Sequence, residues 1–495
     1  MLLSYCTSLL EGIILEITIT LCIFCVIAHV VYNVRFHPLR KYPGPWWLAA
    51  TRLPYTFYVL RGTAARKTKE LHDKYGHVVR INPDTLSFTS SRAWHAQDIY
   101  GPAKPGGQGN IPKDPRYYTE SHMKVFNDPI RRQLIQSHLI PIHHEACLQK
   151  HTSLFISKLI QSQTRSETGE VDLSHWLHLL TTDIAGEVIF GQRFNGLENG
   201  QCQPFIAAIP GLARLFTSVI ELRQYPAVFR MIKICWDWIT RASRSSKPPT
   251  SMVEQPENQM NEDKLACQVG NICEDERLSS TEKEATNMAL IIAGSETTAN
   301  LLMGSIYLLL KHPAYLNKLT SMLRIQFQTS SDMSLSALRD QQYLNAVLKE
   351  SLRLYPPAPG SLFRRTDKEG HVVLGEIIPP KTTLTMNLWA ANCSPLNFHL
   401  SDEMFPERWI QPRPVEYEED DRSAMKAFSF GPQDCPGRNA SGARVYTVEF
   451  GPGLGFRKPR LVDLAEGVYV LEKVAFESEM QISTGIRLIG SASKF

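Results

Sequence analysis

An uncharged apolar segment near the amino terminus constrains this chain most. Residues 17–34 contain no Asp, Glu, Lys or Arg, and residues 12–15 lengthen the apolar run on the other side of Glu16. With a helical rise of 1.5 Å per residue, the segment would measure about 27 to 34 Å, enough to cross a hydrocarbon core of about 30 Å. We therefore predict a single transmembrane anchor over residues 12–34.

The charges on either side of this segment predict its orientation. Glu11 precedes it without any Lys or Arg, whereas Arg35, Arg40 and Lys41 follow it directly. Because positively charged flanks stay in the cytosol, the carboxy-terminal side is expected there. A cleaved signal peptide is the alternative, but it requires a basic leading region and a small-residue cleavage site. The sequence thus favours an anchor with the bulk of the chain in the cytosol.

A proline-rich stretch follows the anchor. In Tyr42-Pro43-Gly44-Pro45 the two prolines fix φ and prevent a helix from continuing. We interpret residues 35–48 as a stiff hinge and residues 49–495 as one catalytic domain.

Composition and charge exclude several classes of protein. Hydrophobic residues make up 43% of the chain and charged residues 21%, which is ordinary for a protein that buries a large core. The net charge of +4, without a basic block, argues against a nucleic-acid partner. Ten scattered cysteines lack the dense framework of a small secreted domain, so reduced thiols are expected.

Hydrophobic periodicity predicts a mainly α fold with small β-sheets. Apolar residues recur at helical spacing over residues 140–195, 205–243 and 282–311, and the last run ends at a proline. Short strand patterns at 78–81 and 86–88 flank a turn, and further strands are expected over 371–386. The polar stretch 244–280 is interpreted as a surface connection between helices.

The first motif with chemical potential is the loop Phe428-Ser429-Phe430-Gly431-Pro432-Gln433-Asp434-Cys435-Pro436-Gly437. Its glycines permit close approach to a flat ligand, and a following helix amino terminus would favour thiolate over thiol. A loop of this kind can present sulfur to a haem iron. The plainer interpretation of the cysteine is a small buried residue.

The second motif is Ala293-Gly294-Ser295-Glu296-Thr297-Thr298, in the middle of the helical run over 282–311. A threonine hydroxyl can bond back to the carbonyl four residues earlier, which opens a groove along the helix. A carboxyl group beside a hydroxyl group suits proton relay. The alternative is a polar patch facing solvent.

The third and fourth motifs bring an acid and two arginines. Glu350 and Arg353 share one helix face, and Arg408 lies in Phe405-Pro406-Glu407-Arg408-Trp409. The carboxylate of Glu350 can share both guanidinium groups in a buried triad. The plainer alternative is that Glu350 and Arg353 form an exposed ion pair on the helix surface.

Along the chain the four motifs follow one another as the threonine segment, the Glu350–Arg353 pair, the Arg408 segment and the cysteine loop, and together they resemble the signature of the cytochrome P-450 superfamily. The likeness covers nearly the whole chain, from the anchor and proline hinge to the cysteine loop. The segments Leu71-His72-Asp73-Lys74-Tyr75-Gly76 and Arg353-Leu354-Tyr355-Pro356-Pro357 look like those of filamentous-fungal microsomal members that oxidise secondary metabolites.

The resemblance implies the cytochrome P-450 fold and a haem b cofactor with Cys435 as its axial ligand. It also implies Thr297 and Glu296 in dioxygen protonation and a structural triad of Glu350, Arg353 and Arg408. The remaining expected cofactor-binding residues are Phe428, Gly431, Gln433, Gly437, Arg364 and Arg132. The expected substrate pocket contains Ala293, Ala358, Pro359 and Leu362.

The implied activity is a monooxygenase that inserts one oxygen atom from O2 into a small lipophilic substrate. The chain contains no Gly-rich dinucleotide motif opening a βαβ unit and no flavin-like domain, so NADPH electrons are expected from a separate flavoprotein reductase. The implied location is the endoplasmic reticulum membrane, with one span and a cytosolic catalytic domain.

The sequence departs from the family at two arginines that hold the haem propionates. Gln433 and Gln133 stand in their places, whereas Arg364 matches a remaining one and Arg131 or Arg132 is a local substitute. Downstream of the cysteine, residues 451–455 read Gly-Pro-Gly-Leu-Gly, which would end the helix expected there.

These departures keep a second hypothesis open, a haem-impaired or inactive remnant of the family. A third hypothesis is a haem-thiolate isomerase or dehydratase. Such an enzyme needs no proton relay, so the presence of Thr297 and Glu296 counts against it.

Overall fold

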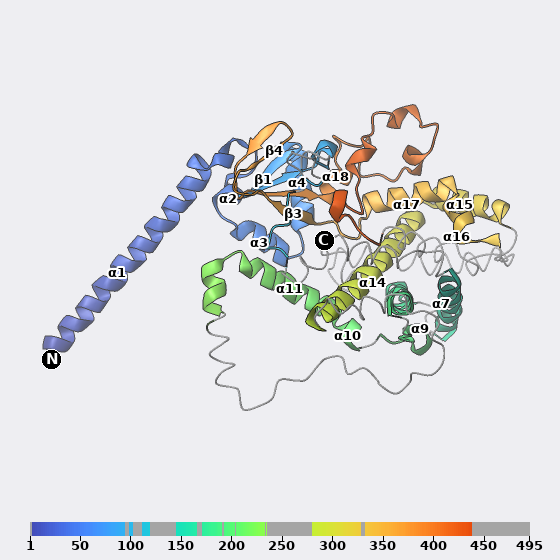
Figure 1. Ribbon diagram of the computed structural model, residues 1–495, viewed down its shortest axis with the longest axis horizontal. Coiled ribbons are helices and arrows are strands. Elements are labelled where there is room, and N and C mark those ends of the chain that lie inside the picture. The colour runs from blue at the N-terminus through green and yellow to red at the C-terminus, as the bar shows by residue number, and fades with distance from the viewer. Residues whose placement is uncertain are drawn as a thin grey trace. The chain divides into compact units, whose positions relative to one another are not determined.

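A computed structural model describes residues 2–94, 99–101, 111–118, 145–165, 171–190, 193–202, 204–232, 234, 280–327 and 332–437 (Figure 1). The chain divides into two compact units. The sheet unit comprises Met1–Pro112, Gly360–Ser401 and Asp421–Met425, and the helical unit comprises Lys113–Pro359, Asp402–Asp420 and Lys426–Phe495. Three predicted features, at residues 131–133, 244–279 and 451–455, lie outside the described residues.

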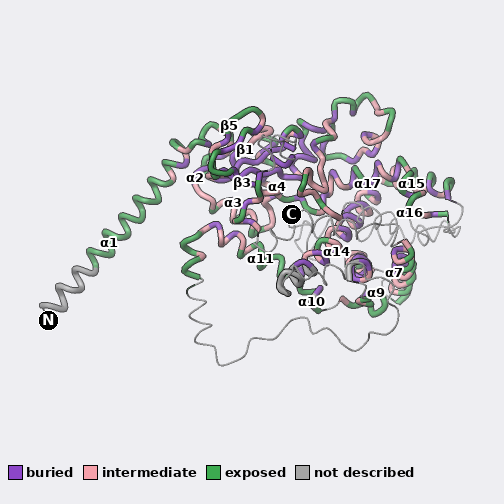
Figure 2. Tube along the Cα trace, viewed as in Figure 1, coloured by how far each residue is buried: buried purple, intermediate pink, exposed green. Residues whose placement is uncertain are grey.

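The predicted anchor is a helix. Helix α1 spans Leu2–Val31 and continues as a π-helical turn over Tyr32–Phe36. Its stretch Gly12–Phe36 is apolar enough to cross a membrane, with a mean hydropathy of 2.5, and its apolar residues are exposed (Figure 2). A core helix of a soluble domain would bury one face, which this helix does not do.

The hinge after the anchor is joined to the first strand of the sheet unit. A 3₁₀ turn over Pro38–Lys41 precedes the prolines, and the short helix α2 spans Trp46–Ala50. The Arg80 backbone N–H donates to the Pro43 carbonyl at 2.8 Å. A Cβ on Gly44 would lie 2.5 Å from the Arg80 carbonyl oxygen, so only glycine permits this close approach.

The main sheet has the strand order β1-β2-β6-β3. Strands β1 (Val78–Asn82) and β2 (Thr85–Phe88) form the predicted antiparallel hairpin. Strand β6 (Thr383–Asn387) runs parallel to β2, and β3 (Ser361–Arg365) pairs antiparallel with β6. Strands β4 (His371–Val373) and β5 (Glu376–Ile378) form a separate two-stranded sheet.

Short helices and turns complete the sheet unit. They are α3 (Leu53–Leu60), α4 (Ala64–Tyr75), α18 (Leu388–Asn392) and two 3₁₀ turns at Ser91–Trp94 and Arg422–Ala424. Of these, α4 and α18 pack against strands of the sheet. Helix α4 buries Ala65, Thr68 and His72, whose spacing of three and four residues places them on one face. Next to α4, Leu48, Tyr55, Val79 and Ile81 form a small core.

The helical unit contains nine α-helices in the part of the chain that the structure describes. They are α7 (Glu145–Arg165), α8 (Leu173–Ala185) with a π turn (Gly186–Phe190), α9 (Gly196–Asn199), α10 (Pro204–Ala207), α11 (Ile209–Arg223), α14 (Ser280–Lys311), α15 (Pro313–Gln326), α16 (Leu335–Arg339) and α17 (Gln342–Leu354). Three further 3₁₀ turns lie at Pro406–Trp409, Val415–Tyr417 and Gly431–Gln433.

Helix α14 is central to the core of this unit and packs against both α8 and α17. Its Leu290, Ala299 and Leu302 are buried in one cluster with Leu177 and Leu180 of α8. The helix ends at Lys311, two residues before Pro313, because the residue that precedes a proline is disfavoured in helical geometry. The sequence predicted this helix, its length and its end.

Candidate active site

The cysteine loop is a compact hydrogen-bonded turn. The Cys435 backbone N–H donates to the Phe428 carbonyl at 2.8 Å, and Asp434 N–H donates to the Gly431 carbonyl at 3.1 Å. Ser429 and Gly431 have φ of 64° and 80°, and glycine at the second position carries no steric cost. Cys435 forms no disulfide and is exposed. Cys435 therefore lies at an accessible position of the loop.

Three hydroxyl groups in the middle of α14 bond back to the helix. Ser295 Oγ donates to the Ile291 carbonyl at 2.7 Å, Thr297 Oγ1 to the Ala293 carbonyl at 2.6 Å and Thr298 Oγ1 to the Gly294 carbonyl at 3.2 Å. Ser295 and Thr298 are buried, whereas Thr297 is only partly buried. The hydroxyl of Thr297 thus forms the predicted bond to the carbonyl four residues earlier, and it lies on an accessible side of the helix.

Glu296, the carboxyl group beside Thr297, has a histidine partner. Its Oε2 lies 3.3 Å from Nε2 of His178 on α8. The other ring nitrogen, Nδ1, is 2.8 Å from the Ser174 carbonyl. Burial lowers the pKa of His178, but Glu296, the Ser174 carbonyl and Asp172 raise that pKa by more, and the net shift is upward.

The third and fourth motifs meet in one buried cluster. Glu350 accepts from Arg353 in a two-point contact of 2.8 and 2.9 Å, and from Arg408 Nε at 3.1 Å. Trp409 Nε1 also donates to this carboxylate, at 2.8 Å. The second arginine, Arg408, makes a further short contact with Asp420. Glu350, Arg353 and Arg408 have no exposed side-chain surface.

The environment of Glu350 favours its charged form. Burial alone would raise the pKa of this carboxyl group, but hydrogen bonds and the charges of Arg353 and Arg408 lower it by more, so the net shift is downward. A backbone N–H, from Phe405 at 2.9 Å, adds to the same effect. The cluster joins α17 to the turn Pro406–Trp409 through hydrogen bonds from Arg408 and Trp409 to Glu350.

Arg364 lies in the sheet unit, on strand β3, where it is buried. Its guanidinium is 5.1 Å from the centre of the Tyr100 ring, and its Nη1 donates to the Ile111 carbonyl at 3.3 Å. The Tyr100 hydroxyl donates in turn to the Leu362 carbonyl at 2.5 Å and accepts from Met386 N–H at 3.0 Å. These contacts hold the guanidinium group of Arg364 beside the sheet.

The expected pocket residues belong to different segments. Ala293 is exposed on α14, Ala358 is exposed and Pro359 buried in the turn after α17, and Leu362 is on β3. Of the predicted cofactor residues, Gln433 and Gly437 are partly buried in the cysteine loop, and Arg132 lies outside the described residues.

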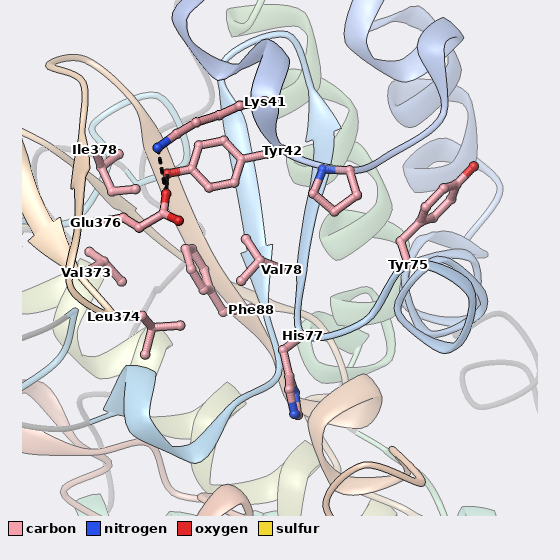
Figure 3. A pocket seen from close by; sticks show the side chains of 11 residues that line it. Lys41, Tyr42, Tyr75, His77, Val78, Phe88, Val373, Leu374, Glu376 and Ile378 are labelled. Atoms are coloured by element: carbon pink, nitrogen blue, oxygen red, sulfur yellow. Dashed lines mark hydrogen bonds and ion pairs between the residues drawn. The ribbon is translucent and has the colours of Figure 1, made fainter.

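A separate pocket, which none of the sequence motifs predicted, lies in the sheet unit (Figure 3). The pocket has a volume of about 400 Å³ and is lined by the hinge residues Lys41 and Tyr42 and by apolar side chains that include Val78, Phe88 and Ile378. At its polar end, Glu376 accepts from Lys41 at 2.6 Å and from Tyr42 at 2.8 Å. None of the predicted site residues lines it.

The sequence motifs also did not include two residues that contact motif side chains. Asp420 and His178 belong to none of the four motifs, although Arg408 and Glu296 do. A charged residue buried beside a motif arginine gives no local pattern in the sequence, because the pairing depends on chain segments that meet only in the folded protein.

Comparison with known proteins decides the family. A model of the cytochrome P-450 family matches residues 42–441. The chain belongs to the cytochrome P-450 family.

Similar proteins of this family come from fungi. Cytochrome P-450 monooxygenase alt3 of Alternaria solani is 33% identical over 88% of this chain and 87% of its own length. Cytochrome P-450 monooxygenase aclL of Aspergillus oryzae is 32% identical over 86% of this chain and 88% of its own length. The cytochrome P-450 described here is thus an oxidoreductase of the monooxygenase class, and its mainly helical fold with small sheets is that of the family.

The cysteine loop fits the haem group that this family carries. A thiolate is a suitable axial ligand for haem iron, and Cys435 is an exposed thiol without a disulfide. The bond from the Cys435 N–H to the Phe428 carbonyl holds the backbone of this residue in the loop.

Proposed function

We propose that this cytochrome P-450 inserts one oxygen atom from O2 into a small lipophilic compound, with Cys435 as the axial ligand of haem b. The observation that carries the proposal is the exposed thiol of Cys435 on a hydrogen-bonded turn. When bound, thiolate-ligated haem supplies electron density that favours O–O cleavage. The substrate is proposed to be an intermediate of fungal secondary metabolism, because the similar monooxygenases come from fungi.

The other loop residues would hold the flat face and edge of the group. Phe428, Gly431, Gln433 and Gly437 come from the loop itself. Arg364 would pair with a propionate, since a guanidinium forms strong charge-assisted hydrogen bonds with carboxylates. Arg132 is proposed as a second propionate partner beside Gln133.

Glu296 and Thr297 are proposed to deliver protons during oxygen reduction. The carboxyl group is a donor when protonated, and the adjacent hydroxyl can accept and pass on a proton through water. The pocket that holds the substrate is proposed to include Ala293, Ala358, Pro359 and Leu362. Their side chains are small or apolar, which suits a lipophilic compound.

Electrons are proposed to come from NADPH through a separate membrane-bound flavoprotein reductase. The long apolar helix α1 supports anchoring, and Arg35, Arg40 and Lys41 support a cytosolic catalytic domain. We propose the endoplasmic reticulum as the membrane. An anchored enzyme and an anchored reductase meet by diffusion in one plane.

Gln433 favours the second candidate, a haem-impaired remnant, because an amide forms weaker bonds with a propionate than a guanidinium does. The absorption spectrum of the purified full chain, reduced and saturated with carbon monoxide, separates the two. A thiolate-type Soret band supports the proposed ligand, and an apo or imidazole-type spectrum overturns it.

Two variants sharpen this experiment. Cys435→Ala should abolish the thiolate spectrum while circular dichroism stays unchanged. Cys202→Ala, another cysteine without a disulfide in the helical unit, should keep the spectrum. A thiolate spectrum that persists in Cys435→Ala would reject the assignment of this ligand.

A further inference from the structure

The imidazole ring of His178 is held at both nitrogens. Nδ1 lies 2.8 Å from the Ser174 carbonyl on its own helix, and Nε2 lies 3.3 Å from Oε2 of Glu296 on α14. A carbonyl oxygen only accepts hydrogen bonds, so the contact with Ser174 requires a proton on Nδ1. The tautomer of the ring is therefore set by the helix on which it lies.

This tautomer determines how many protons the pair holds. In a neutral ring with its proton on Nδ1, Nε2 carries a lone pair and would face a carboxylate oxygen, which also has only lone pairs. The contact is attractive only when a second proton lies between the two atoms, either on Nε2 or on the carboxyl group. The His178–Glu296 pair thus stores one exchangeable proton, and the raised pKa of His178 agrees with this.

The His178–Glu296 pair is partly exposed to solvent, and its Glu296 lies next to Thr297 in the sequence. The side chains of His178 and Glu296 are 26% and 24% exposed, so water can reach them. Glu296 directly precedes Thr297, whose hydroxyl donates to the Ala293 carbonyl. The hydroxyl has a single proton, and that proton is used in this hydrogen bond. Thr297 can therefore pass on a proton only when a neighbouring acid supplies another one.

Three buried or partly buried ionisable groups on α8 and the elements packed against it have partners of their own. His151 of α7 is 2.9 Å from Glu187 of the π turn. Asp183 accepts from the backbone N–H groups of Gly196 and Leu197 at 2.9 and 2.8 Å. Besides Glu296, Asp172 at the start of α8 acts on His178 through its charge.

We propose that His178 is a positioning residue that holds Glu296 and reloads it with protons from solvent. The inference rests on the proposed role of Glu296 in proton delivery. The proton on Nε2 of His178 moves to Oε2 of Glu296, and the carboxyl group gives it to a water molecule beside Thr297. His178, left neutral beside a carboxylate, then takes up one proton from solvent. One proton enters, one leaves, and no electrons move.

The first experiment follows the His178 proton itself and requires no turnover. The full-chain holoenzyme is prepared with isotope-labelled histidine, and the His178 resonance, identified by its loss in His178→Gln, is titrated by NMR. We expect a pKa above 6.5 in the unaltered protein, and a fall of about 1 or more in Glu296→Gln, because an opposite charge is lost. His175→Gln, an exposed histidine of the same helix, should leave it unchanged. A His178 pKa that is the same with and without the Glu296 charge would overturn the pairing.

The second experiment measures peroxide released per NADPH consumed as a function of pH. It uses the holoenzyme with a flavoprotein reductase and the compound that gives the largest spin-state shift in a binding screen. The unaltered enzyme should release little peroxide below the pKa of His178 and progressively more as the pH rises through it. His178→Gln still hydrogen-bonds Glu296 but cannot titrate, so it should release several-fold more peroxide at low pH and show a flat profile.

His175→Gln should follow the unaltered enzyme in this assay. A His178→Gln profile that rises with pH like that of the unaltered enzyme would overturn the proton-reloading role. Failure of the proposed function has a different signature, the absence of a thiolate-type carbon monoxide spectrum. The NMR titration still decides the His178–Glu296 pairing in that case.

Discussion

The Glu350 carboxylate and the Arg353 guanidinium form a two-point ion pair within α17, and neither side chain has exposed surface. Arg408 joins the pair from the turn Pro406–Trp409. One carboxylate therefore neutralises two buried cations, with help from Asp420 at Arg408. A buried charge without its partner is costly, and removal of one member typically costs about 3–5 kcal/mol.

Glu350→Gln should thus lower the free energy of unfolding by about 3–5 kcal/mol, since Arg353 and Arg408 lose their shared counter-charge. Urea unfolding followed by circular dichroism measures this. Glu407→Gln is the matched control, because Glu407 forms a partly exposed pair with Lys318 worth about 0–1 kcal/mol. Equal losses in the two variants would contradict a special role for the buried cluster.

Gly304 on α14 lies against the ring of Tyr355, which follows α17. A Cβ at Gly304 would be 2.3 Å from Tyr355 Cδ1 and 2.7 Å from Cγ, so the ring would have to move. We expect Gly304→Ala to lower the unfolding temperature, with a cost of about 1–3 kcal/mol from overpacking. In Gly211→Ala on α11, where an added Cβ meets no atom within 4 Å, stability should be unchanged or improved.

Combining Gly304→Ala with Tyr355→Ala tests the steric explanation. Addition of the alanine at position 304 should cost less when the ring is absent than when it is present. If its cost is the same in both backgrounds, the contact is not the cause.

His72 should make stability depend on pH. It is buried between α4 and β2, where Nδ1 bonds to the Gly76 carbonyl and Nε2 accepts from the Ser87 hydroxyl, both at 2.8 Å. Burial lowers its pKa to about 4, against 6.5 in the unfolded chain. Between these values the unfolded chain binds more protons, so stability falls as the pH decreases from 6.5 towards about 4, by about 3 kcal/mol in all.

Urea midpoints recorded across this range give the slope. The slope should flatten in His72→Gln and persist in His399→Gln, which alters an exposed histidine of the same unit. An unaltered slope in His72→Gln would assign the acid sensitivity to other groups.

Thr297→Ala should uncouple NADPH consumption from substrate oxidation. Loss of the hydroxyl removes one step of the proposed proton path, and the expected result is more peroxide per NADPH. The control is Thr217→Ala on α11, whose hydroxyl forms the same kind of bond, to the Ala213 carbonyl at 2.9 Å. Peroxide release that stays at the unaltered level in Thr297→Ala would count against the relay.

Local patterns in the sequence were sufficient for several elements. Proline and turn chemistry fixed the end of α14 and the hairpin around Pro83, since both effects act between near neighbours. The order of the four motifs predicted the family, which the comparison confirms. The joining of Glu350, Arg353 and Arg408 followed from the same motifs.

The sequence by itself determined the apolar anchor helix, the long helix α14, the hairpin of β1 and β2, and the residue types that stand in the motifs. Tertiary structure decided the partners: His178 for Glu296, Asp420 for Arg408 and Tyr355 for Gly304. The physical reason is that periodicity sets the apolar face of an element but not which distant side chain meets a polar group on it. Those pairings depend on how helices pack, and packing is specified by the shapes of many side chains together.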